Sequence, residues 1–205
     1  MRVSLFDYGT GNLHSLQKAL EAHGARVRVE ADAASALDAD ALVLPGVGAF
    51  GAAAGSLAAA RHDIVAALDA GFPCLAICLG MQLLFECSEE SPGAGLGYLP
   101  GHVRRLQAAR VPQMGWNDVA PVARAGSVDP LFAGLASPVV YYANTFVPAP
   151  APDDGTRVIG WSTYDNDRFA AALRKRNTWG VQFHPEKSAS AGLHMIANFL
   201  SQVPS

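Results

Sequence analysis

The sequence predicts an α/β fold: a mainly parallel central sheet with helices on both faces, plus added antiparallel strands. In the first part of the chain, short apolar runs alternate with stretches of helical periodicity, which is typical of parallel sheets. In the second part, short strand candidates follow one another and are separated by Pro, Gly and Asp, which favours antiparallel pairing. The length of 205 residues favours one domain spanning residues 1–205.

The first part contains strand candidates whose connections carry helical patterns. The strands are expected at residues 3–6, 26–30, 41–44 and 74–77. The helical stretches are expected from Leu13 to Gly24, as a short helix or loop at 32–40, over most of 53–70, and after Cys78. Because the carboxyl ends of parallel strands meet at one edge, the loops that follow Phe6, Leu44 and Ile77 are expected to lie together.

The second part alternates strands with turn-forming residues. Strands are expected at 98–106, 118–122, 139–142, 157–161, 169–174 and 178–183. Residues 91–97 are expected to form a loop and 148–155 a turn rich in Pro and Asp. A final amphipathic helix is predicted by the spacing of Leu193, Ile196, Ala197 and Leu200.

Composition excludes several classes of protein. Half the residues are hydrophobic and the net charge is −3, so a globular chain is expected, with no nucleic-acid and no membrane partner. Three cysteines, an odd number, favour a reducing compartment, and with no signal peptide read at the N-terminus a cytoplasmic location is expected. Cys74 and Cys78 lack nearby His or Cys residues that would complete a zinc pattern, so no metal is expected.

Cys78 lies where a buried strand meets an amphipathic helix. Small residues, Ala76 and Gly80, flank this position and allow a tight turn that exposes the side chain above the sheet. The positive end of a helix favours a thiolate, and the free amides of the first turn can bind an oxyanion. The alternative is a small buried cysteine at the start of a core helix.

Two further segments are expected at the same edge. His184 and Glu186 follow a strand two residues apart, so we expect them to point the same way, with the acid orienting the imidazole that serves the thiol. The alternative is a capped turn in which Glu186 stabilises the last helix. The loop 45–48 could offer amides to an oxyanion, or be an ordinary tight turn. It lacks the Lys of a phosphate-binding loop.

These motifs resemble the class I (triad) glutamine amidotransferases, which have a flavodoxin-like fold. The resemblance is carried by residues 77–82 (Ile-Cys-Leu-Gly-Met-Gln) and by the segments 7–13, 45–50, 112–117 and 182–188. Within the family, these segments are most similar to the glutaminase subunits of imidazole glycerol phosphate synthases. The resemblance implies that Cys78 attacks the side-chain amide of glutamine to form a thioester. It also implies that His184 protonates the departing ammonia, that Glu186 orients His184, and that no cofactor is needed.

The resemblance also implies a substrate pocket and a partner. Residues that hold glutamine or its oxyanion are expected at Val47, Gly48, Leu79, Gln82, Asn144, Thr145 and Phe146. The expected partner is a (β/α)₈ cyclase subunit, which uses the ammonia to make imidazole glycerol phosphate and aminoimidazole carboxamide ribotide in histidine biosynthesis. Residues expected to face that partner are Asn12, Gln113, Trp116 and Lys187.

The chain departs from the family pattern at two places. Ala76 stands where the family has Gly, and Asn144 and Phe146 stand where it has His and Tyr. The loss of two polar groups leaves activity intact if the contacts to glutamine come from the backbone. Two alternatives remain open. One is a catalytically silent partner-binding subunit that only activates a synthase. The other is a stand-alone thiol hydrolase, or a glutaminase that supplies another acceptor, as in anthranilate or guanylate synthesis.

Overall fold

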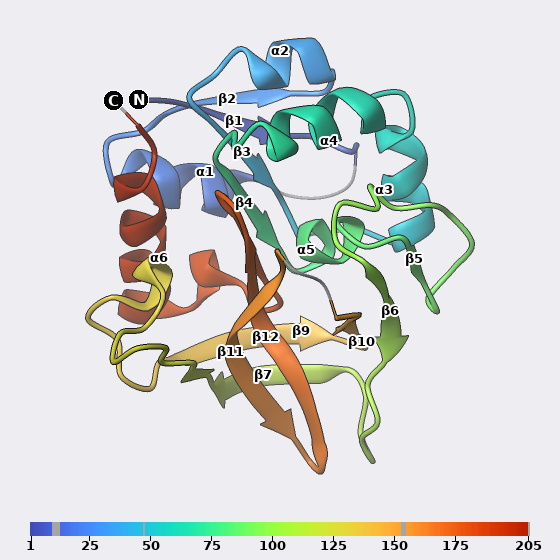
Figure 1. The fold of residues 1–205 in the computed structure, drawn as a ribbon, viewed down its shortest axis with the longest axis vertical. Coiled ribbons are helices and arrows are strands. Elements are labelled where there is room, and N and C mark those ends of the chain that lie inside the picture. Colours follow the sequence, from blue (N-terminus) through green and yellow to red (C-terminus); the bar gives the residue numbers. More distant parts are fainter. Residues whose placement is uncertain (10–12, 47, 153–154, 205) are drawn as a thin grey trace.

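A computed structural model describes residues 1–9, 13–46, 48–152 and 155–204 and contains one large mixed sheet (Figure 1). In spatial order its strands are β2 (Arg26–Glu30), β1 (Arg2–Phe6), β3 (Ala41–Leu44), β4 (Cys74–Ile77), β13 (Thr178–Val181), β12 (Asp167–Lys175), β11 (Arg157–Tyr164) and β8 (Ala120–Pro121). The first five strands pair in parallel and the last three are antiparallel. The predicted α/β class is therefore confirmed.

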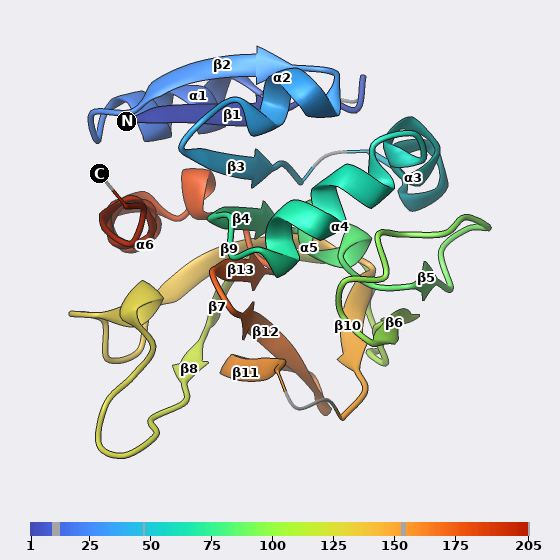
Figure 2. The same cartoon turned by 45° about the horizontal axis from the view of Figure 1, so that its top comes forward.

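Alternation along the parallel strands separates two apolar cores. In β4, Leu75 and Ile77 belong to one buried cluster, and Cys74 and Ala76 belong to the other, because successive side chains point to opposite faces. Helices α1 (His14–Glu21) and α6 (Ala189–Ser201) cover the first face. The second face is covered by α2 (Ala33–Leu37), α3 (Phe50–Leu57), α4 (Arg61–Asp69) and α5 (Leu79–Leu83) (Figures 1 and 2). Among the described residues, no helix is both long enough and apolar enough to cross a membrane.

Two smaller sheets flank the carboxyl edge of the main one. One contains β10 (Phe146–Pro150), β6 (Gly101–Arg105) and β5 (Cys87–Ser88), and the other pairs β7 (Gln113–Asp118) with β9 (Val139–Asn144). Two short 3₁₀ turns complete the secondary structure at η1 (Pro130–Phe132) and η2 (Pro185–Lys187).

Several predicted boundaries differ from the structure. Residues 148–150 belong to strand β10 rather than to a turn, and they are accommodated because β10 is an edge strand, where prolines cost few hydrogen bonds. Strand β7 was not predicted, and of the strand expected at 118–122 only β8 pairs in the main sheet. The helix expected over 53–70 is interrupted, and α3 and α4 are separate helices.

Candidate active site

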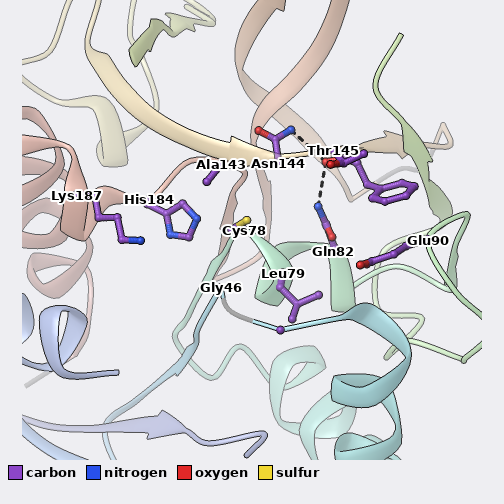
Figure 3. A pocket seen from close by; sticks show the side chains of 12 residues that line it. Gly46, Cys78, Leu79, Gln82, Glu90, Ala143, Asn144, Thr145, His184 and Lys187 are labelled. Carbon is purple, nitrogen blue, oxygen red and sulfur yellow. Dashed lines mark hydrogen bonds between the residues drawn. The ribbon is translucent and has the colours of Figure 1, made fainter. Parts of the chain in front are cut away.

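A cavity of about 360 Å³ opens at the carboxyl ends of β3, β4 and β13 (Figure 3). Predicted site residues that line it are Gly48, Cys78, Leu79, Gln82, Asn144, Thr145, Phe146, His184 and Lys187. Figure 3 shows His184 and Lys187 to one side of Cys78 and Gln82 and Glu90 to the other. Val47 and Asn12 lie outside the described residues.

Cys78 sits on a strained turn between β4 and α5. Its φ of 49° and ψ of −106° are unusual for a residue with a side chain. Hydrogen bonds hold the turn: the Cys78 amide donates to the carbonyl of Val181 at 2.7 Å, and the Gln82 amide donates to the carbonyl of Cys78 at 3.0 Å. Such a strand–turn–helix geometry presents the thiol at the top of the sheet, as in nucleophile elbows.

Two glycines allow the end of β3 to pack against this turn. A Cβ added to Gly46 would lie 2.6 Å from the Ile77 carbonyl oxygen, and one added to Gly80 would collide with the Leu44 carbonyl. The small residues around the nucleophile are thus required by close backbone approach between two strands. Ala76 is fully buried within β4, so its methyl group is accommodated in the core rather than in the turn.

Oxyanion donors are available next to the thiol. Leu79 is the first residue of α5, and amides of the first helical turn have no partner within the helix. Gly48, with a φ of 113°, lines the same cavity from the loop after β3. Gly48 and Leu79, two of the residues expected to hold the oxyanion, thus line the same cavity as the thiol.

His184 and Glu186 form a close pair behind the thiol. The Nδ1 atom of His184 and the Oε1 atom of Glu186 are 2.9 Å apart, with the side chains 4% and 9% exposed. Glu186 lies in turn η2 and not on a strand, so Pro185 and the turn bring the carboxylate back to the ring, rather than the alternation we expected. With Nδ1 directed at Glu186, the Nε2 atom of His184 is left to face Cys78.

The surroundings of His184 favour its protonated form. Burial alone lowers the pKa of His184, but hydrogen bonds and charge interactions with Cys78 and Glu186 outweigh burial and raise the pKa to about 10. The arrangement therefore favours an imidazolium beside the Cys78 sulfur at neutral pH, which can return a proton to a leaving amine.

We expect the protonation of His184 to stabilise the folded chain. Its folded pKa of about 10 exceeds the ordinary value of 6.5, so the folded state holds this proton more tightly than the unfolded state does. The stabilisation should be fully present below pH 6.5 and be lost as the pH rises through about 10. Urea unfolding across this pH range should show a larger loss of unfolding free energy for the wild type than for His184→Asn. Equal losses in the two proteins would contradict the assignment.

The pocket wall beyond Cys78 is built around a backbone carbonyl. The Nε2 atom of Gln82 donates to the carbonyl of Phe146 at 3.1 Å, and the Nδ2 atom of Asn144 donates to the same carbonyl at 3.2 Å. The polar contact at Phe146 thus comes from its main chain and survives the absence of a Tyr hydroxyl. Thr145 lies between Asn144 and Phe146 in the sequence and also lines the cavity.

Two residues of the site were missed by the sequence analysis. Gln182 donates from Nε2 to the Sγ atom of Cys78 at 3.4 Å. Glu90 lines the cavity opposite His184, and its Oε2 atom accepts a hydrogen bond from the amide of Phe50 at 3.1 Å (Figure 3). Gln182 precedes His184 by two residues, so strand alternation could have indicated it. Glu90 lies after the short strand β5 and has no local sequence signal.

The residues predicted to face a partner divide into two groups. Trp116 is 56% exposed on β7, and Lys187 is exposed on η2 beside the cavity. Gln113 does not lie on that surface: it is 2% exposed, because alternation along β7 turns it inward while Met114 and Trp116 face outward.

Comparison with known proteins identifies the family to which the chain belongs. The family described as Glutamine amidotransferase class-I matches residues 4–203. The chain belongs to this family of glutamine-hydrolysing enzymes. Imidazole glycerol phosphate synthase subunit HisH from Synechococcus elongatus is 43% identical over 209 residues, covering 98% of this chain and 94% of the relative. The protein of the same name from Thermus thermophilus is 44% identical over 204 residues, covering 96% of each chain.

Solved structures share the fold. PurLQS from Thermotoga maritima superposes with a TM-score of 0.79 at 20% identity and covers 99% of both chains. A second solved structure, described as a glutamine amidotransferase, gives a TM-score of 0.75 at 17% identity and covers 97% of both chains. At this identity the likeness concerns the fold alone.

Proposed function

We propose that this chain, as a single domain over residues 1–205, is the glutaminase subunit of an imidazole glycerol phosphate synthase. It hydrolyses glutamine at Cys78 and supplies the ammonia to a (β/α)₈ cyclase subunit. The observation that carries the proposal is that Cys78 and His184 line one cavity, with Glu186 bonded to His184, in a chain more than 40% identical to HisH subunits. The odd number of cysteines supports a reducing, cytoplasmic setting.

The first half of the reaction forms a thioester. The sulfur of Cys78 attacks the side-chain carbonyl carbon of glutamine, and the carbonyl oxygen takes up negative charge near the amide of Leu79. When the C–N bond breaks, the protonated Nε2 atom of His184 gives its proton to the departing amine, which leaves as ammonia. The glutamyl group remains on sulfur.

The second half returns the enzyme to its starting state. A water molecule gives a proton to the now neutral His184 and its oxygen attacks the thioester carbonyl. The C–S bond breaks, the electron pair returns to the sulfur of Cys78, and glutamate is released. One glutamine and one water have become one glutamate and one ammonia, and the sulfur again faces an imidazolium.

The polar groups at the far end of the cavity suit the amino-acid end of glutamine. Glu90 carries a carboxylate on the side of the cavity away from His184, where it can pair with the α-ammonium group (Figure 3). The Gln82 amide and the Phe146 carbonyl lie between this carboxylate and the thiol. Glutamine bound in this sense presents its side-chain amide to Cys78.

The exposed face of β7 and β9 suits the docking of a partner. Met114 and Trp116 are 67% and 56% exposed, and the ring of Trp116 packs edge-on against Tyr141 at 6.1 Å. The main chain of Tyr141 is bonded to the triad turn: its carbonyl accepts from the amide of His184, and its amide donates to the hydroxyl of Ser188, both at 2.9 Å. A partner on this face would therefore contact a strand that directly supports His184.

We expect Trp116→Ala to weaken binding of the cyclase by about 30-fold, because large exposed aromatic side chains dominate interface energies. Titration calorimetry of the two subunits measures the effect. Val29→Ala, which removes an exposed apolar side chain on the opposite edge strand β2, is the control and should bind normally. Equal affinity of the Trp116 variant and the wild type for the cyclase would exclude the face of β7 and β9 as the binding surface.

The proposal is tested by mixing the chain with the (β/α)₈ cyclase from the same cell. With the cyclase's own phosphorylated substrate present, glutamine should then support formation of imidazole glycerol phosphate, with glutamate released in equal amount. An ammonium salt should replace both glutamine and this chain, since ammonia is all that the cyclase takes from the glutaminase reaction. Glutamate release with an anthranilate or guanylate synthase partner, and none with the cyclase, would favour the alternative acceptors.

A further inference from the structure

The side chain of Gln182 is buried against the nucleophile. It is 0% exposed, and its Nε2 atom donates to the Sγ atom of Cys78 at 3.4 Å. Its Oε1 atom accepts from the Nε2 atom of Gln82 at 3.1 Å. Gln182 lies just beyond β13, where its amide donates to the carbonyl of Ala171 at 2.9 Å. Both the main chain and the side chain of this residue are therefore held in place.

A main-chain carbonyl determines which end of each side-chain amide donates and which accepts in this network. The carbonyl of Phe146 can only accept hydrogen bonds, so the amide group of Gln82 must turn its NH₂ toward it. The same NH₂ faces Gln182, which must then present its oxygen to Gln82. The NH₂ of Gln182 is left to face the sulfur, so its role as a donor follows from the network.

We propose that Gln182 is a positioning residue for the nucleophile: its amide holds the Cys78 sulfur in place and favours the anionic form of that sulfur. The inference rests on the proposed function, in which Cys78 attacks glutamine. Through Gln82, which lines the cavity, the same chain of amides connects the glutamine pocket to the sulfur. A substrate that contacts Gln82 can thus affect the position of the Cys78 sulfur through Gln182.

The proposed donor would act at both stages of the reaction. During attack it restricts the sulfur to one orientation on a turn that is already strained at Cys78. During hydrolysis of the thioester it stabilises the sulfur as the C–S bond breaks and the electron pair returns to it. Among the residues that the structure describes, the other ionisable groups that face the sulfur or line its cavity are His184, with Glu186 behind it, Lys187 and Glu90. Gln182 differs from all of them because it donates without changing charge.

The test is the pH dependence of Cys78 alkylation by iodoacetamide, followed by mass spectrometry of the Cys78 peptide. In Gln182→Met, a change of similar volume that removes both hydrogen bonds, the pH of half-maximal rate should rise by about one unit, since a hydrogen bond to a charged group is typically this strong. The kcat should fall about 10-fold, with a smaller change in KM. Thr178→Val, a buried change on strand β13, which leads to Gln182, should keep the wild-type profile.

A folded Gln182→Met protein with an unchanged alkylation profile and an unchanged kcat would overturn the inference. Gln182→Asn provides a second test if the Met variant does not fold. The Asn side chain remains polar, but its amide is too short to reach the Cys78 sulfur. The Asn variant should therefore show the same rise in the pH of half-maximal alkylation. Alkylation does not require glutaminase activity. A chain that shows the predicted shift but releases no glutamate with any partner would contradict the proposed function and leave the role of Gln182 standing.

Discussion

Cys78→Ala should lower glutamate release by the chain and its cyclase partner by at least ~10⁴-fold, because among the described residues that line the cavity no other thiol is present to carry the glutamyl intermediate. Loss of a nucleophile removes the covalent path and leaves only the oxyanion donors and binding. The rate is measured by coupling glutamate to a dehydrogenase in the presence of the partner. Ammonium-driven synthesis by the same complex should remain, since it does not use the thiol.

The exposed thiol of Cys87 provides the matched control. Cys87 lies on β5 and does not line the cavity, so Cys87→Ala should release glutamate at the wild-type rate. If Cys78→Ala kept the glutamine-dependent activity of the complex, the chain would be a silent binding subunit, and the catalytic account would fail.

Glu186→Gln should lower kcat by about 10⁴-fold, the scale seen when the orienting acid of a catalytic triad loses its charge. The Glu186 carboxylate lies 2.9 Å from Nδ1 of His184 and helps to raise the pKa of that imidazole to about 10. A neutral amide would lower the pKa of His184 and could bind the wrong tautomer of the ring. Steady-state kinetics and NMR titration of His184 measure the two effects.

Removal of a carboxylate elsewhere controls for the change in charge. Glu89 has a side chain 54% exposed beside His102, outside the cavity, so Glu89→Gln should leave kcat unchanged. A Glu186→Gln protein with wild-type kcat and an unaltered His184 titration would mean that the acid only caps the turn before α6. That was the alternative left open by the sequence.

The core of the fold could be predicted from the sequence because its strands are short apolar runs. The strands 41–44 and 74–77 have unambiguous apolar patterns, and their parallel order brings the loops of the site to one edge. Strand β10 could not be predicted in this way, since Pro148 and Pro150 are typical of turns. Only the pairing of β10 with β6 explains their position.

The triad could be predicted as a set of residues but not as a geometry. The positive φ of Cys78 and the contacts of Gly46 and Gly80 with neighbouring backbone depend on how β3 packs against the turn. Glu186 reaches His184 through the 3₁₀ turn η2, which the alternation of a strand does not describe. Gln182 was missed because its role depends on Gln82, which is 100 residues away in the chain.

The departures from the family pattern also have a local explanation. Phe146 contributes its carbonyl rather than a ring substituent, and both Gln82 and Asn144 donate to it. In this segment the polar lining of the cavity is therefore kept by the side-chain amide of Asn144 and the main-chain carbonyl of Phe146. A sequence pattern records side chains, so it could not show that the contact belongs to the backbone.

The central claim is that Cys78 carries the glutamyl group. It is tested most directly by acid quenching of the chain and its cyclase partner during turnover of glutamine, followed by mass spectrometry of the peptides. We expect a glutamyl adduct on the peptide that contains Cys78 and none in Cys78→Ala. Glutamate release without any adduct on Cys78, at a rate that Cys78→Ala retains, would contradict it.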